Sequence, residues 1–164
     1  MLEKINWEEL DWPAGISGLA VALDRPWPLH DPRFLPASKI NAPTTRHAIL
    51  ADGCIISDAH IESAVIGVRS VIESGATIRN SVLMGADFYE DEAPEHRRPG
   101  CPPLGVGKNS VIDRAIIDKN ARTGENVAIT PDGKAPNVGS VNYYIRDSIV
   151  VVPKNALIPD GTRI

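Results

Sequence analysis

Aliphatic side chains recur at intervals of six residues along most of this chain, with an occasional step of five. A small side chain usually stands two positions before each of them. An amphipathic helix repeats its apolar face about every 3.6 residues and a hairpin strand about every two, so neither element produces this spacing. The positions in the pattern are Ile49, Ile55, Ile61, Ile66, Ile72, Ile78, Met84, Val106, Ile112, Ile117, Thr123, Ile129, Val152, Ile158 and Ile164.

This pattern predicts an all-β fold, a left-handed parallel β-helix built from hexapeptide repeats. Each hexad forms one short strand and a turn, and about 18 residues close one triangular coil. A single coil cannot bury its apolar side, so the coils must stack. An antiparallel sandwich is the alternative, but it does not explain why a dozen positions keep one template. Thr123 would bury a hydroxyl, which is tolerable if that hydroxyl bonds a nearby carbonyl.

Glycine and asparagine residues between the hexads suit corners with positive φ or tight bends. Two polar, proline-containing stretches, 86–103 and 130–144, interrupt the repeat and are expected to protrude as loops. The acidic run that begins at Glu90 is interpreted as part of a solvated loop. Residues 1–39 contain no hexads but hold all three tryptophans, and we expect this irregular segment to pack on or cap the solenoid. The β-helix domain is then 40–164.

Composition and charge exclude several classes of function. The 164 residues carry a formal net charge of −4, which disfavours general binding to nucleic acid or to anionic membranes. The sequence shows neither a spanning apolar run nor a signal peptide. Cys54 and Cys101 are the only cysteines, so a disulfide scaffold is excluded and a reducing cytoplasm is expected.

Four segments resemble the ADP-glucose pyrophosphorylase (glucose-1-phosphate adenylyltransferase) family, in its cyanobacterial and plant-like branch. They keep the family's order and together cover about residues 27–164. They are PRFLPASKI from Pro32, AVIGVRSVIESGATIRNSVLMGADFYE from Ala64, GVGKNSVIDRAIIDKNARTGENVAI from Gly105, and IRDSIVVVPKNALIPDGTRI from Ile145.

The resemblance implies the C-terminal β-helix domain of such an enzyme without its nucleotidyltransferase domain. The family's glycine-rich nucleotide loop has no counterpart here, since GISGLA (residues 15–20) lacks the flanking strand and a basic partner. We therefore expect no catalytic residues and no cofactor on this chain, Mg²⁺ and ATP belonging to the catalytic domain. The expected role is regulation and assembly of the enzyme that makes ADP-glucose for glycogen or starch. The expected partner is an oligomer, of like or unlike subunits, that includes a nucleotidyltransferase domain or chain.

The same resemblance assigns effector binding to Lys119, Lys154 and, more weakly, Arg33. The effectors are phosphorylated small molecules such as 3-phosphoglycerate, or phosphate itself. Such anions need charge-assisted donors that converge from different segments. We expect Lys119 and Lys154 to lie on separate coils, from which they could meet on one face. The alternative is that both lysines are merely solvated.

The runner-up function is a stand-alone hexapeptide acyltransferase, a trimer with its active site between prisms. His60 could serve as its catalytic base, although a surface position on the prism is the preferred interpretation. A zinc site of three histidines on neighbouring coils is not expected. The spacing of His47 and His60 does not match a full coil, and His96 falls in a loop.

Overall fold

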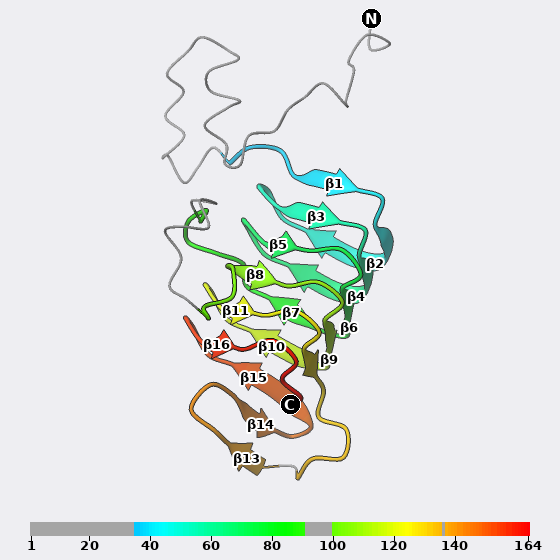
Figure 1. The fold of residues 1–164 in the computed structure, drawn as a ribbon. Coiled ribbons are helices and arrows are strands. Elements are labelled where there is room, and N and C mark those ends of the chain that lie inside the picture. The colour runs from blue at the N-terminus through cyan, green and yellow to red at the C-terminus, as the bar shows by residue number, and fades with distance from the viewer. Residues whose placement is uncertain (1–34, 91–99, 136) are drawn as a thin grey trace, which may run out of the picture.

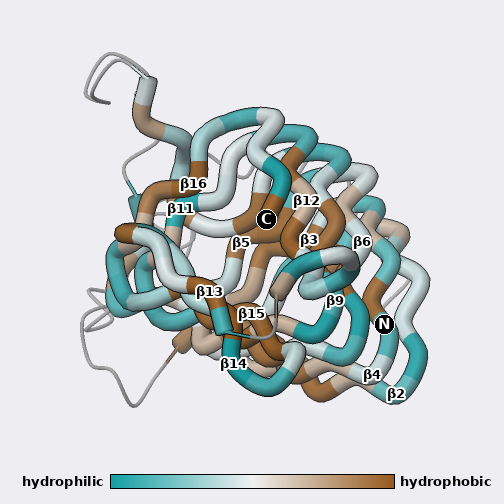
Figure 2. Tube along the Cα trace, turned by 90° about the horizontal axis from the view of Figure 1, so that it is seen from below, coloured by the Kyte–Doolittle hydropathy of each residue, from teal (hydrophilic) through white to brown (hydrophobic). Residues whose placement is uncertain are grey.

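The structure is a computed structural model that describes residues 35–90, 100–135 and 137–164. Within these ranges all of the regular secondary structure is β-strand. The strands are short and follow one another around six stacked coils (Figure 1). Figure 2 looks along the stack and shows successive coils lying almost on top of one another. The described chain is thus a parallel β-helix, as the hexad period predicts.

Each coil contributes one strand to the first face of the prism, a six-stranded parallel sheet. Its strands in order are β1 (Lys39–Asn41), β3 (Ile55–Ser57), β5 (Val71–Ile72), β8 (Gly105–Val106), β11 (Arg122–Thr123) and β16 (Leu157–Ile158).

The other two faces share long strands that turn the corner between them. β4 (His60–Ile66) pairs with β2 (Thr44–Leu50) along its length, then with β6 (Thr77–Arg79) on the second face and β7 (Val82–Leu83) on the third. Below them, β9 (Val111–Asp113) and β12 (Ala128–Ile129) continue the second face. The third face continues with β10 (Ala115–Ile117) and β15 (Ile149–Val152).

The prism interior is filled by the aliphatic positions of the repeat. Ile61, Ile78, Ile112 and Ile129 are fully buried on the second face, one above the other. The small residues that precede them let the chain turn beside the core. Ala59, Ala64, Ser70, Ala76, Ser110, Ala115, Ala121 and Ala156 are all buried.

Three predicted core positions are wrong by one residue. Ile49 and Met84 are 67% and 45% exposed and Ile55 is half-buried, whereas Ile56 and Leu83 are buried. The cause is the length of the corner, because the buried positions on either side of Asp58, and likewise of Asn80, are five residues apart instead of six. A coil that contains such a corner is shorter than three full hexads, as the pairing of Ile55 with Val71 shows.

The second interruption of the repeat is not a simple loop. It contains β13 (Asn137–Gly139) and ends where β14 (Tyr144–Arg146) begins, and these two strands form an antiparallel hairpin. β14 then pairs antiparallel with β15 at the bottom of the stack (Figure 1). The hairpin thus extends the third face beyond the last parallel strand there. Residues 91–99 of the first interruption and residues 1–34 lie outside the described residues, so the predicted packing of the N-terminal segment does as well.

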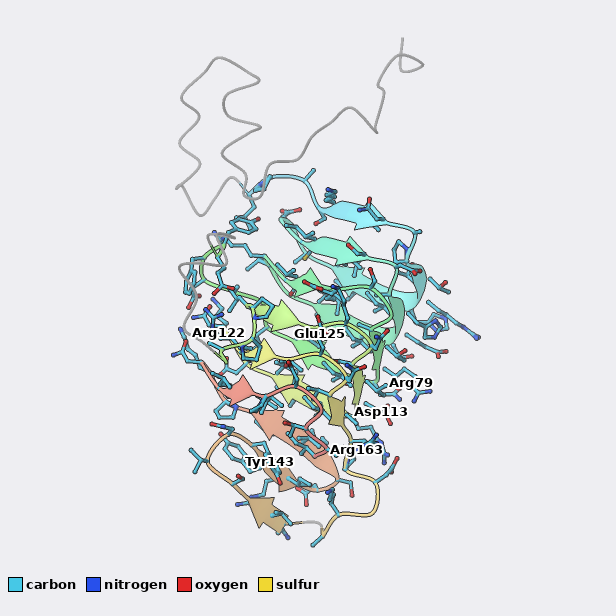
Figure 3. All side chains as sticks on the ribbon, viewed as in Figure 1. Arg79, Asp113, Arg122, Glu125, Tyr143 and Arg163 are labelled. Atoms are coloured by element: carbon cyan, nitrogen blue, oxygen red, sulfur yellow. The ribbon has the colours of Figure 1, made fainter. Side chains whose placement is uncertain are left out.

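The outer surfaces of the second and third faces differ in chemistry. On the second, Arg46, Glu62, Arg79 and Asp113 lie side by side in register with alternating charge, and Figure 3 shows Arg79 and Asp113 at the same side of the prism. The third face carries a row of six outward-facing apolar side chains that we call the apolar column. Four of the six residues are 38–67% exposed. The apolar column is Ile49, Val65, Val82, Ile116, Val151 and Tyr144.

Thr123 occupies a core position, as the period predicts, and has 0% relative exposure. Its hydroxyl oxygen has no hydrogen-bond partner among the described residues, so the bond to a carbonyl that would make its burial tolerable does not form. An unpaired buried hydroxyl costs about 1–3 kcal/mol. The Thr123→Val substitution replaces it with a methyl group and is expected to raise the free energy of unfolding by about 1–2 kcal/mol.

Chemical denaturation followed by circular dichroism measures this change. Thr77→Val is the matched control, because Thr77 lies on the outer side of β6 and is not buried. Its effect should stay within about 0.5 kcal/mol. Equal stabilisation by both variants would show that the orphaned hydroxyl of Thr123 is not the cause.

Candidate functional site

Lys119 and Lys154 occupy equivalent positions on adjacent coils. β10 and β15 pair in register, Ile117 opposite Val152, and each lysine follows shortly after the end of its strand. The backbone amide of Asn155 donates to the carbonyl oxygen of Lys119 over 3.0 Å, so the pairing of the two coils continues around the corner. The two lysines therefore lie one strand spacing apart, ~4.8 Å along the axis. Their predicted convergence on one side of the prism is what the structure has.

Each lysine is followed by an asparagine that makes the turn. Asn120 and Asn155 both have a φ of 60°. This is the left-handed conformation, which asparagine tolerates better than most residues. Asn120 is buried, with 7% relative exposure, and its amide nitrogen donates to Asn155 Oδ1 over 3.2 Å. The two Lys-Asn turns are thus tied together.

Both ammonium groups bind one carboxylate, that of Asp87. Lys119 Nζ donates to Asp87 Oδ1 over 2.8 Å, and Lys154 Nζ donates to Asp87 Oδ2 over 2.7 Å. Asn120 makes two further hydrogen bonds with Asp87. Its Nδ2 donates to Asp87 Oδ2 over 3.1 Å, and its Oδ1 accepts from the backbone amide of Asp87 over 2.8 Å. We call Asp87, Lys119, Asn120, Lys154 and Asn155 the lysine corner.

The lysine corner is open to solvent and presents two ammonium groups. The side chains of Lys119, Lys154 and Asp87 are 41%, 49% and 37% exposed. The hydrogen bond from Lys119, followed by those from Lys154 and Asn120, holds the pKa of Asp87 far below its ordinary value. The hydrogen bond to Asp87 raises the pKa of Lys154. These three groups carry a net charge of +1, and the neighbouring carboxylate of Asp118, which also acts on Lys154, offsets it. The two lysines therefore attract a further anion only weakly while Asp87 stays in place.

Sequence reasoning missed Asp87 and the role of Asn120. Asp87 stands in the quoted LMGADFYE motif, but it is separated from Lys119 by 32 residues and from Lys154 by 67 residues. The sequence pattern predicts only that asparagines between the hexads, Asn120 among them, form corners. Arg33, the third predicted effector residue, lies outside the described residues.

The loop that begins at Asp87 is anchored to the prism at two more points. Glu90 forms an ion pair with Arg122 at 2.6 Å, and its other carboxylate oxygen accepts from the Leu104 amide over 2.8 Å. Arg122 is the first residue of β11 and lies at the left side of the prism in Figure 3, and its side chain is only 21% exposed. The interpretation of Glu90 as solvated is therefore wrong, because a largely buried arginine and an amide compete successfully with water for it.

Tyr89 forms the second anchor. Its hydroxyl donates to the Gly53 carbonyl oxygen over 2.9 Å, and the Arg69 guanidinium lies 5.9 Å from the centre of its ring. Burial raises the pKa of Tyr89 to about 12. Glu90 and Tyr89 thus hold the start of the loop in place beside the lysine corner.

The histidines in the described ranges do not form a site. His47 and His60 are both exposed, which agrees with the surface position preferred for His60, while His30 and His96 lie outside those ranges. In the part of the chain that the structure describes, no three His, Cys, Asp or Glu residues are grouped to hold a metal ion. Nor do the described residues include a helix long and apolar enough to cross a membrane.

Two comparisons with known proteins found similar sequences. Residues 33–163 match the model of the GLGC left-handed parallel β-helix domain family, which also supplies the handedness. The chain is 43% identical over 150 residues to the glucose-1-phosphate adenylyltransferase small subunit, chloroplastic/amyloplastic, of Triticum aestivum. This similarity covers 85% of the chain and 30% of the wheat protein.

Proposed function

The chain belongs to the family of glucose-1-phosphate adenylyltransferase β-helix domains, and on this premise we propose that it is the regulatory and assembly module of such an enzyme. The reaction that it would serve converts ATP and glucose 1-phosphate to ADP-glucose and diphosphate, in glycogen or starch synthesis. A nucleotidyltransferase domain or subunit carries that reaction, together with Mg²⁺ and ATP. The β-helix domain itself contributes no catalytic residue and binds no cofactor.

The regulatory part of the proposal rests on the lysine corner. Lys119 and Lys154 come from different coils, and their ammonium groups approach the same carboxylate. A phosphoryl group presents acceptor oxygens of the same kind, and charge-assisted bonds to ammonium groups are among the stronger hydrogen bonds. The ligand is a phosphorylated small molecule such as 3-phosphoglycerate, or inorganic phosphate, and Arg33 is the proposed third donor.

The assembly part rests on the apolar column. Exposed contiguous apolar patches commonly mark protein–protein interfaces. The column crosses six paired strands, about 24 Å of flat sheet at the usual strand spacing. A flat face of this kind can pack against its own copy across a two-fold axis, and we assign a second copy of this chain as its occupant. Because Cys54 and Cys101 are both free thiols, we place the assembly in a reducing compartment, the cytoplasm.

The effector proposal predicts that removing both lysine charges abolishes anion binding. Wild-type chain should gain thermal stability in 3-phosphoglycerate or phosphate, since a ligand that binds only the folded state stabilises it. The double variant Lys119→Gln/Lys154→Gln should lose this protection, with affinity at least about tenfold weaker for each lysine removed. Isothermal titration calorimetry measures the affinity directly.

Lys108→Gln provides the matched control. Lys108 precedes Asn109 in a third Lys-Asn turn, but its ammonium lies between Glu73 and Glu125, at 3.9 and 3.8 Å, rather than beside a second lysine. This variant should bind the anion as the wild type does. Absence of protection in the wild type, or equal loss in the control, would contradict an effector site at the lysine corner.

A further inference from the structure

We propose that Asp87 is a built-in competitor of the anion at the lysine corner, so that a ligand binds by displacing its carboxylate from Lys119 and Lys154. This inference rests on the proposed effector site and concerns the regulation of that site. Asp87 then sets both the affinity of the corner and the class of anion that it accepts.

The carboxylate of Asp87 bridges the two ammonium groups of the lysine corner. Its two oxygens engage different ammonium groups, at 2.8 and 2.7 Å. These are the same donors that a phosphoryl group would need. Each ammonium group has two further N–H donors, but an anion that accepts the two bonds now made to Asp87 must take the place of this carboxylate.

Asp87 competes strongly because it is held at the site. Its backbone amide is bonded to Asn120 Oδ1 over 2.8 Å, and Asn120 is itself buried. Tyr89 and Glu90 anchor the next residues to the prism. A tethered group competes at an effective concentration of the order of millimolar or above, so a free carboxylate of equal charge has no advantage over it.

A phosphate monoester does have an advantage. Near neutral pH it carries a charge of about −1.5 to −2 and three acceptor oxygens, against −1 and two oxygens for Asp87. A carboxyl group is ionised near neutral pH, and the lysines lower the pKa of Asp87 further, so protonation does not release the lysines there. Displacement of the Asp87 carboxylate by an anion of higher charge does release the lysines. The corner should therefore select phosphorylated ligands over simple carboxylates.

The Asp87→Asn variant tests this inference. It removes the competing charge and keeps both the size of the side chain and the hydrogen bond from the backbone amide of residue 87 to Asn120. Calorimetric titration of the full chain should show about five- to tenfold tighter binding of inorganic phosphate than in the wild type. Acetate, which should not bind the wild type measurably, should become a detectable ligand of the variant.

Asp52→Asn is the matched control, since Asp52 is an exposed carboxylate in the turn before β3, on the same edge of the prism but several coils away from the turn before β11 that carries Lys119; its phosphate affinity should equal that of the wild type. Asp87→Ala repeats the release of the lysines, and circular dichroism verifies the fold of each variant. Phosphate binding by wild type that is unchanged or weaker in both Asp87 variants overturns the inference and leaves the effector site intact. Binding by none of the chains overturns the effector site as well.

Discussion

Substitution of Gly85 by alanine is expected to destabilise the solenoid more than any other change considered for this chain. Gly85 follows β7 with φ of +85°, and a Cβ atom there would overlap the Val68 carbonyl oxygen of the preceding coil. The left-handed conformation alone costs alanine about 1–2 kcal/mol. Displacing a backbone group of the adjacent coil adds to it, so the free energy of unfolding should fall by about 3–5 kcal/mol.

Gly133→Ala separates the two causes. Gly133 also has a positive φ, of +72°, but nothing lies within 4 Å of the Cβ position. Its loss of stability should be only the conformational part, about 1–2 kcal/mol. Urea denaturation of both variants measures the difference. Similar losses in the two would mean that the close approach of the coils at Gly85 is not what requires glycine.

Replacement of Val82 by lysine is expected to abolish self-association. Val82 lies in the middle of the apolar column, paired with Val65 on one side and Ile116 on the other. It is partly exposed in the single chain, so the long lysine side chain can reach water without disturbing the fold. In a face-to-face dimer the same ammonium would be buried without a partner, which costs several kcal/mol. The association constant should fall at least about a hundredfold.

Sedimentation velocity of the full chain measures this effect. Val111→Lys is the matched control, since Val111 points outward from β9 on the second face and lies off the apolar column. It should associate as the wild type does. A wild-type chain that is monomeric at all accessible concentrations, or equal dissociation by both variants, would contradict a second copy as the occupant. A trimer that binds acetyl-CoA would instead favour the acyltransferase alternative.

The β-helix could be predicted from local sequence because its core repeats. Ile61, Ile78 and Ile112 fall where the period places them, since strands of adjacent coils must align their inward side chains to pair. The errors at Ile49, Ile55 and Met84 arise because corner length varies by one residue. Several residue types turn a corner with positive φ, including aspartate at Asp58 and arginine at Arg114, so composition does not reveal which corners are short.

The outer surface was less predictable than the core. The sequence pattern places Val65, Val82 and Ile116 in three different coils, and only the register of paired strands aligns them as one column. The hairpin of β13 and β14 was expected as a loop. Its strands have no hexads, and they form because β14 pairs with the free edge of β15.

By itself, the sequence determined that the chain forms a stack of coils and that Lys119 and Lys154 occupy turns of that stack. It did so because a repeated hexad has one way to bury its aliphatic residues. Only the tertiary structure decided that the two lysines meet and that Asp87 stands between them. The insertion that carries β13 and β14 separates the lysines in sequence, while parallel pairing of β10 with β15 returns them to adjacent coils. Asp87 reaches them because Tyr89 and Glu90 fix its loop against the prism, a long-range arrangement that no local pattern encodes.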